Sequence, residues 1–122
     1  MKQVLIVDDN EVSRIALADL LEYLGYSVAS AVDGFEGIEV FRRIPSIAVL
    51  ITDVEMPGMN GVEMLQELCQ EIRERSVRVF VLSGSELDDW WLHARAHGAI
   101  GWLHKPVDPV SLEAALRILG ER

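Results

Sequence analysis

Short apolar runs alternate along the chain with longer segments whose apolar residues recur every three or four positions. Five runs rich in β-branched residues predict strands at residues 3–7, 26–31, 47–52, 77–82 and 100–103. The first, third and fourth runs are almost continuously apolar, which is typical of strands covered on both faces. Helical spacing between and after the strands gives apolar stripes at Val12, Ile15, Ala16, Leu20 and Leu24, at Val62, Leu65, Leu68, Cys69 and Ile72, and at Leu112, Ala115, Leu116 and Leu119.

The starts of several predicted helices are marked by capping residues. Residues 33–36 (DGFE) and 60–63 (NGVE) each place a capping side chain three positions before a glutamate. Residues 85–88 (SELD) are a weaker version of the same pattern. Residues 108–109 (DP) place a cap before a proline in the first helical position.

The alternation of strands and helices predicts an α/β fold with a parallel sheet covered by helices on both faces. Parallel strands of this kind are joined by right-handed crossovers. The binding crevice of such a fold lies beyond the carboxyl ends of its strands. Functional side chains are therefore expected in the loops that follow residues 7, 31, 52, 82 and 103.

Polar residues follow four of the predicted strands at this edge. Asp8 and Asp9 follow the first strand, Asp53 the third and Ser83 the fourth, and Lys105 comes two residues after the fifth. Neighbouring strands lie only about 4.8 Å apart, so adjacent strand ends would bring these side chains together. The sequence thus predicts three carboxylates beside one hydroxyl and one ammonium group.

Three carboxylates in one crevice repel one another, and at least one pKa rises unless a cation joins them. Oxygen ligands without Cys or His favour Mg²⁺ over Zn²⁺. Mg²⁺ and Lys105 together would balance the three negative charges. The metal, the ammonium and the hydroxyl of Ser83 would then suit a phosphoryl group, with a carboxylate to attack phosphorus.

Composition and charge narrow the class of function. The 122 residues are 50% hydrophobic and 25% charged, which predicts one globular domain over residues 1–122. The net charge of -9 argues against direct binding to nucleic acid or an anionic membrane, because both need clustered Lys and Arg. The longest early apolar run, residues 4–7, is too short for a signal peptide or membrane span, and Cys69 is the single cysteine, so a cytoplasmic location is expected.

Taken together and in this order, the motifs resemble a bacterial two-component response regulator receiver domain of the chemotaxis-regulator type. The resemblance covers essentially the whole chain. It rests on Asp8-Asp9, Asp53 followed by MPGMNG at 56–61, Ser83-Gly84, GAIGW at 98–102, and Lys105-Pro106. It implies a flavodoxin-like, doubly wound sheet of five parallel strands in the order 2-1-3-4-5.

The resemblance also implies which residue accepts the phosphoryl group and which residues hold the metal. Asp53 would be the phosphoacceptor. Mg²⁺ would be held by Asp8, Asp9, Asp53 and the backbone carbonyl of Glu55. On this interpretation the doubled aspartate is not itself the reactive group but holds the metal for Asp53.

Three further residues receive roles from the same resemblance. Lys105 would contact the phosphoryl group, and Ser83 would move toward it. Trp102, three positions before Lys105, would change rotamer together with Ser83. The peptide bond between Lys105 and Pro106 is expected to be cis.

The implied function is a phosphorylation-dependent signalling switch and not a turnover enzyme. The donor would be a phosphohistidine on a sensor histidine kinase or a histidine phosphotransfer protein. Phosphorylation would alter the surface around the last two helices and the last strand, which then binds a downstream protein target or effector domain differently. Homodimerisation through the last helices is left open.

Other functions are disfavoured by particular residues. A degenerate receiver that only binds proteins is an alternative, although every expected site residue is present. An Asp-nucleophile phosphatase would need a second acid at Asn10, and the chain leaves no room for a cap domain. A flavin-binding electron carrier would need a loop rich in Ser, Thr and Gly where Asp8 and Asp9 stand.

A helix predicted over residues 86–97 suggests a contact surface. One face of this helix is formed by Leu87, Trp91, Ala94 and Gly98. Trp90 lies beside that face and Leu92 points away from it. We therefore predict a partner surface that includes Trp90, Leu92 and Trp102, against the alternative of a broad core stripe with one stray leucine.

Overall fold

A computed structural model describes residues 3–84 and 89–117, in which strands and helices alternate. The elements are β1 (Gln3–Val7), α1 (Glu11–Tyr23), β2 (Ser27–Ala31), α2 (Gly34–Arg43), β3 (Ile47–Asp53), α3 (Gly61–Glu74), β4 (Arg78–Ser83), α4 (Asp89–Ala96), β5 (Ala99–His104) and α5 (Pro109–Ala115). The strands are parallel and lie in the order β2-β1-β3-β4-β5, which confirms the predicted fold. The cap predicted at 85–88 and Leu119 lie outside the described residues.

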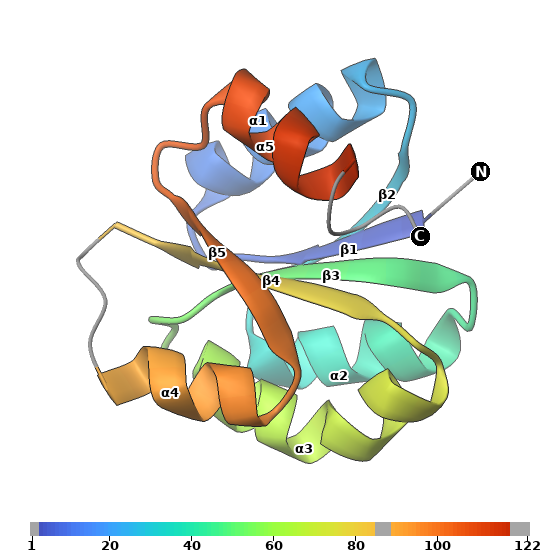
Figure 1. The fold of residues 1–122 in the computed structure, drawn as a ribbon, viewed down its shortest axis with the longest axis vertical. Helices are drawn as coiled ribbons and strands as arrows, with labels where there is room; N and C mark the ends of the chain where they lie inside the picture. Colours follow the sequence, from blue (N-terminus) through green and yellow to red (C-terminus); the bar gives the residue numbers. More distant parts are fainter. Residues whose placement is uncertain (1–2, 85–88, 118–122) are drawn as a thin grey trace.

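The sheet separates two layers of helices (Figure 1). Helices α1 and α5 cover one face, and α2, α3 and α4 cover the other. Each layer closes a separate hydrophobic core, one around Phe41, Leu50 and Leu65 and the other around Leu21 and Phe80. The central strands are buried on both faces, as their continuous apolar runs predict.

The buried faces of α3 and α5 follow the predicted stripes, but that of α1 does not. Val12 and Ile15, which begin the predicted stripe of α1, are 78% and 52% exposed, so this part of the prediction is wrong. Leu17 and Leu21 are the buried residues of the helix. Helix α1 carries apolar residues around most of its circumference, so periodicity alone offers more than one buried face.

The predicted capping residues of three helices are confirmed. Asn60 and Glu63 form a reciprocal capping box at α3, with both bonds at 2.9 Å. Asp33 accepts from the backbone N–H of Glu36 at 2.8 Å at the start of α2. Asp108 accepts from the first turn of α5, whose first residue is a proline. These capping residues fix the position at which each helix begins after the loop that follows a strand.

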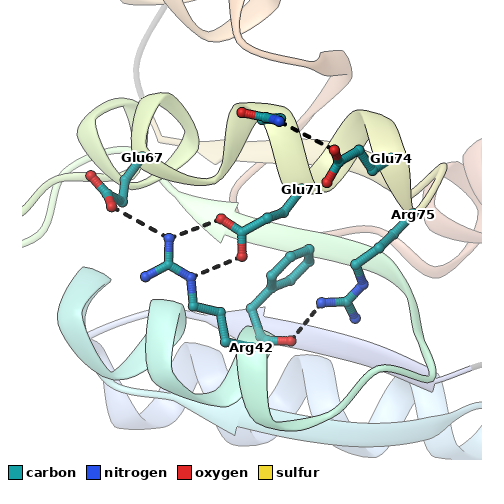
Figure 2. Close-up of polar contacts among 7 residues, drawn as sticks. Arg42, Glu67, Glu71, Glu74 and Arg75 are labelled. Carbon is teal, nitrogen blue, oxygen red and sulfur yellow. Dashed lines mark hydrogen bonds and ion pairs between the residues drawn. The ribbon is translucent and has the colours of Figure 1, made fainter.

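Helices α2 and α3 are joined at the surface by Arg42 (Figure 2). Its guanidinium makes two hydrogen bonds of 2.8 Å to the carboxylate of Glu71 and lies 3.4 Å from Glu67. These bonds raise the pKa of Arg42 and lower that of Glu71. Because Arg42 is largely exposed, solvent and salt screen this link.

A second arginine joins the same two helices closer to the core. Arg75, directly after α3, donates hydrogen bonds of 2.8 Å to the backbone carbonyls of Phe41 and Ile44. Its guanidinium carbon lies 4.0 Å from the centroid of the Phe41 ring. The bond to Phe41 is drawn in Figure 2. Arg75 therefore satisfies carbonyl groups at the C-terminal end of α2 that have no partner within the helix.

Candidate functional site

The register of the sheet brings the predicted site residues to one level. Val7 of β1 pairs with Thr52 of β3, so the next residues along each strand, Asp8 and Asp53, lie side by side. Asp53 pairs in turn with Leu82 of β4. Residues separated widely in the sequence therefore meet at the carboxyl edge of the central strands.

Lys105 joins two of the three carboxylates. Its Nζ donates to Oδ2 of Asp53 at 2.9 Å and lies 3.0 Å from Oδ2 of Asp8. Asp8 is fully buried and Asp53 is 8% exposed. The contact with Asp8 is an ion pair without hydrogen-bond geometry, so Oδ2 of Asp8 has no hydrogen-bond partner among the described residues. A buried carboxylate oxygen that has no hydrogen bond can still interact with a further cation.

The pKa values of Asp53 and Lys105 reflect competing effects. Burial raises the pKa of Asp53, and repulsion from Asp8 adds to it, while the hydrogen bond and charge of Lys105 act in the opposite direction without cancelling the rise. Burial acts to lower the pKa of Lys105, but its interactions with Asp53 and Asp8 outweigh burial and raise that pKa. Lys105 is therefore held as a cation beside carboxylates that it does not fully neutralise.

The acidic cluster fits a divalent metal ion. Carboxylate oxygens of Asp8, Asp9 and Asp53 lie within 4.8 Å of one another. The donors are all oxygen atoms, which suits a hard cation such as Mg²⁺. Burial is the main cause of the raised pKa of Asp53 and repulsion from Asp8 adds to it, and Oδ2 of Asp8 has no hydrogen bond among the described residues, so a further cation would stabilise the cluster.

The loop that carries the aspartate pair is held by several backbone contacts. The N–H of Asp8 donates to the carbonyl of Ala31 at 3.1 Å, and Oδ1 of Asp8 accepts from the N–H of Asn10 at 3.0 Å. The side chain of Asn10 caps α1 by accepting from the N–H of Ser13 at 2.9 Å. The guanidinium of Arg14 donates to the carbonyl of Asp8 at 2.9 Å.

Asp53 is held in place by the loop that follows it. The N–H of Gly61, at the start of α3, donates to the carbonyl of Val54 at 2.9 Å. A Cβ built on Gly61 would lie 2.0 Å from the carbonyl oxygen of Asp53, so the position admits only glycine without displacement. The hydroxyl of Thr52 donates to that same carbonyl at 2.9 Å. The N-terminus of α3 thus packs directly against the backbone of Asp53.

The other predicted residues lie at the ends of β4 and β5 and in the loop after β3. Ser83 ends β4, is 4% exposed, and accepts at its carbonyl from the N–H of Lys105 at 2.9 Å. The Lys105–Pro106 peptide bond is cis. Glu55 is exposed and borders a surface hollow lined also by Met56, Pro57 and Asn60.

Three tryptophans form a row across α4 and β5. The Trp91 ring lies 5.1 Å from Trp102 and 6.2 Å from Trp90, centroid to centroid, in edge-on contacts. Trp102 is 40% exposed and Leu92 is 65% exposed, while Trp90 is half-buried. Leu87, expected on the core face, lies outside the described residues, but Ala94 is buried as predicted. An apolar surface therefore exists over α4 and β5.

The sequence patterns indicated neither the contact made by Arg14 nor the reason why residue 61 is a glycine. The contact of Arg14 is made to a backbone carbonyl, and no spacing rule marks such a partner. Gly61 lies in a recognised motif, but its closeness to the Asp53 carbonyl depends on how α3 enters beside β3. Both residues act on the backbone of an aspartate and not on its carboxylate.

Comparisons with known proteins give a consistent result. Residues 4–117 match the family model described as the response regulator receiver domain. Protein PilH of Pseudomonas aeruginosa is 30% identical over 112 residues, covering 92% of each chain. The chemotaxis protein CheY4 of Vibrio cholerae superposes with a TM-score of 0.88 at 31% identity, covering 96% of this chain and 97% of that one.

A receiver domain from Clostridium thermocellum superposes with a TM-score of 0.86 at 30% identity, covering 96% of this chain and 92% of that chain. Within the described residues, helices are too short or too polar to cross a lipid bilayer. The two superpositions extend over the sheet and both helical layers, because nearly the whole chain is covered.

Proposed function

This chain belongs to the response regulator receiver domain family, and we propose that Asp53 is the phosphoacceptor of a phosphorylation-dependent switch. Receiver domains are signalling switches and generally not turnover enzymes. The observation that carries the proposal is the carboxylate of Asp53 at the end of β3, hydrogen-bonded to Lys105 and beside Asp8. The burial that raises the pKa of Asp53 also keeps its carboxylate poorly solvated, which suits a nucleophile.

The transfer proposed is from a phosphohistidine to Asp53. A carboxylate oxygen of Asp53 attacks phosphorus, the new P–O bond forms as the P–N bond breaks, and the histidine nitrogen leaves with its electron pair and takes up a proton from solvent. Lys105, already a cation at this position, would offset the charge of the transferred group. Hydrolysis reverses the modification: water attacks phosphorus, the acyl P–O bond breaks, and the carboxylate and inorganic phosphate are released.

The residues that would hold Mg²⁺ are Asp8, Asp9, Asp53 and, through its backbone carbonyl, Glu55. When bound, the metal ion supplies positive charge that stabilises the phosphoryl oxygens. The formal charge supports this assignment, since among the described residues the ammonium of Lys105 is the one cation that forms ion pairs within this cluster of three carboxylates, with Asp8 and Asp53. The Oδ2 of Asp8, which is buried and has an ion pair with Lys105 but no hydrogen bond among the described residues, is consistent with a further cation in the cluster.

The output would be a change in the surface over α4 and β5. Ser83 and Lys105 lie at adjoining strand ends and are linked by a backbone hydrogen bond, so a phosphoryl group at Asp53 would bear on both. Ser83 would move toward that group, and Trp102 would change rotamer with it, which alters the row of tryptophans. Because these contacts would differ between the phosphorylated and unphosphorylated forms, phosphorylation would shift the equilibrium between two conformations of this surface.

The partners proposed are a histidine kinase or histidine phosphotransfer protein as donor and a protein target or effector domain as receiver of the signal. The exposed Leu92 and Trp102 support a protein contact on the α4–β5 face. A cytoplasmic location is part of this proposal and is in keeping with the acidic net charge of -9 and the single cysteine. The alternative partner for this face is a second copy of the chain. The molecular mass of the phosphorylated protein in solution would show such a homodimer.

Incubation with a small-molecule phosphodonor and Mg²⁺, followed by intact mass measurement, tests the proposal. We expect a gain of one phosphoryl group that hydroxylamine removes, because an acyl phosphate is sensitive to this nucleophile. The gain should disappear in Asp53→Ala and in the presence of a chelator. A wild-type protein that gains no phosphoryl group would favour the degenerate receiver instead.

A further inference from the structure

Arg14 makes a contact that the proposed phosphorylation chemistry does not use. It lies in the first turn of α1 and is half-buried. Its Nη1 donates to the backbone carbonyl oxygen of Asp8 at 2.9 Å. Across residues 3–84 and 89–117, the Arg14 guanidinium forms no ion pair with a carboxylate, although the residue that it contacts is itself an acid. The positive charge is thus directed at the backbone of the acidic cluster.

The carbonyl that Arg14 binds belongs to the peptide group joining Asp8 to Asp9. The rotation of this peptide group sets the direction in which the chain, and with it the side chain of Asp9, continues. Asp8 is held independently, by its N–H on the carbonyl of Ala31 and by the ion pair of its Oδ2 with Lys105 Nζ at 3.0 Å, whereas the bond from the Asn10 N–H to Asp8 Oδ1 spans the Asp8–Asp9 peptide group and reports on it. The hydrogen bond of Arg14 is therefore not needed to place the carboxylate of Asp8.

Asp9 is in a different position. Its side chain is exposed, and it has no hydrogen bond to another described residue. A carboxylate oxygen of Asp9 nevertheless lies within 4.8 Å of those offered by Asp8 and Asp53. Its placement must come from the backbone on either side, which is held by Asn10 as the cap of α1 and by Arg14 at the preceding peptide.

We propose that Arg14 is a positioning residue for the metal ligand Asp9, because it fixes the Asp8–Asp9 peptide group. The inference rests on the proposed function, since it requires the acidic cluster to bind Mg²⁺. A purely electrostatic effect of Arg14 would have the opposite sign: a fixed positive charge beside the site repels a cation, so its removal would strengthen metal binding. Positioning requires that its removal weaken metal binding.

The test is calorimetric titration of the full chain with Mg²⁺ for the wild type and three variants. Arg14→Met removes the charge and the donors but keeps a good helix former with a similar stem. Arg14→Lys keeps the charge with a shorter reach, and it serves as a second folded variant. Arg43→Met removes the same charge at the C-terminal end of α2, where Arg43 pairs only with Glu39 at 3.6 Å among the described residues.

We expect Arg14→Met to bind Mg²⁺ about 10-fold more weakly than the wild type, as is typical when a residue that orients a ligand is lost. Arg14→Lys should recover part of this affinity, and Arg43→Met should match the wild type. Without metal, hydrogen exchange at the Asn10 amide should quicken in Arg14→Met while exchange across β1 stays unchanged. A merely structural role would raise exchange throughout β1 and α1.

Equal or tighter Mg²⁺ binding by Arg14→Met would overturn the inference, because the charge effect alone would then account for the data. An unchanged Asn10 amide would overturn it as well. A wild-type protein that fails to bind Mg²⁺ would instead overturn the metal site of the proposed function, and this inference with it. The wild-type titration therefore separates the two failures.

Discussion

Replacing Arg75 by methionine should weaken the packing of α2 on α3. The guanidinium makes two hydrogen bonds of 2.8 Å to backbone carbonyls, of Phe41 and Ile44, and stacks 4.0 Å from the Phe41 ring centroid. Methionine keeps most of the side-chain stem and its packing. The variant thus removes the charged head and little else.

The expected loss in free energy of unfolding is about 2–3 kcal/mol. Hydrogen bonds from a charged donor are worth about 1.5–3 kcal/mol each, and the stacking on Phe41 adds about 0.5–1 kcal/mol. Two effects reduce this sum. Arg75 is only half-buried, so water replaces part of each lost bond. Its Nε is buried and has no hydrogen-bond partner among residues 3–84 and 89–117, a cost that the variant removes. The lowered pKa of Arg75, caused mainly by burial, reflects the same desolvation.

Urea denaturation followed by circular dichroism measures the effect, and Arg42→Met is the matched control. A loss of this size should lower the urea midpoint by about 1–2 M with an unchanged slope. Arg42 makes bonds of similar length but to exposed carboxylates (Figure 2), so its removal should shift the midpoint by less than about a third as much. Adding 1 M NaCl, a condition in which the Debye length is about 3 Å, should shrink the Arg42 effect and leave the Arg75 effect.

The reasoning depends on burial being the difference between the two arginines. If Arg42→Met lowers the urea midpoint as much as Arg75→Met does, then surface ion pairs, and not the hydrogen bonds from Arg75 to backbone carbonyls, hold α2 on α3. If the Arg75 effect falls in salt by the same factor as the Arg42 effect, the link is a screened charge interaction. Either result refutes the estimate.

Four further substitutions test the site itself. Asp53→Asn should stabilise the metal-free protein at neutral pH by about 0.5–2 kcal/mol. Because the folded-state pKa of Asp53 is raised, its ionised form costs stability above that pKa, so the gain, measured by thermal unfolding, should shrink as pH falls through it. Gly61→Ala should cost about 1–3 kcal/mol of stability and slow phosphorylation, because the new methyl group meets the Asp53 carbonyl. Gly84→Ala, where a Cβ has open space, is the control for stability, and equal losses would remove the steric argument. Glu55→Ala should change the lifetime of the phosphorylated form, because the exposed Glu55 carboxylate, two residues after Asp53, would act on the attacking water; an unchanged lifetime in a phosphate-release assay would contradict this prediction. Tryptophan emission should change on adding Mg²⁺ with a phosphate mimic in the wild type and less in Trp102→Phe; identical responses would exclude Trp102 from the switch.

Local patterns in the sequence were sufficient for the elements and for the identity of the acidic site. The apolar runs give the strands, and the capping residues at 33, 60 and 108 give helix starts, because both depend on neighbours within a few positions. Polar residues directly after those runs must lie at the carboxyl edge of a parallel sheet. The strand order itself came from the resemblance to receiver domains, since periodicity does not specify which strands are neighbours.

Contacts between distant segments were decided only by the tertiary structure. Lys105 and Asp53 are 52 positions apart, and their bond of 2.9 Å exists because the register aligns the ends of β3, β4 and β5. The same holds for α1, where Leu17 and Leu21 are buried and Val12 is exposed. Apolar residues occur on several sides of α1, so the periodicity allows more than one buried face. The path of the chain from β1 into α1 determines which of these faces packs against the sheet.

The sequence by itself determined which residues end the strands, and therefore that three carboxylates, one hydroxyl and one lysine share an edge. It did not determine how the backbone between them is held. The contact of Arg14 with the Asp8 carbonyl and the approach of Gly61 to the Asp53 carbonyl depend on where α1 and α3 begin relative to the sheet. A backbone carbonyl is present at every residue, so only the three-dimensional arrangement selects the one that a side chain or a helix end reaches.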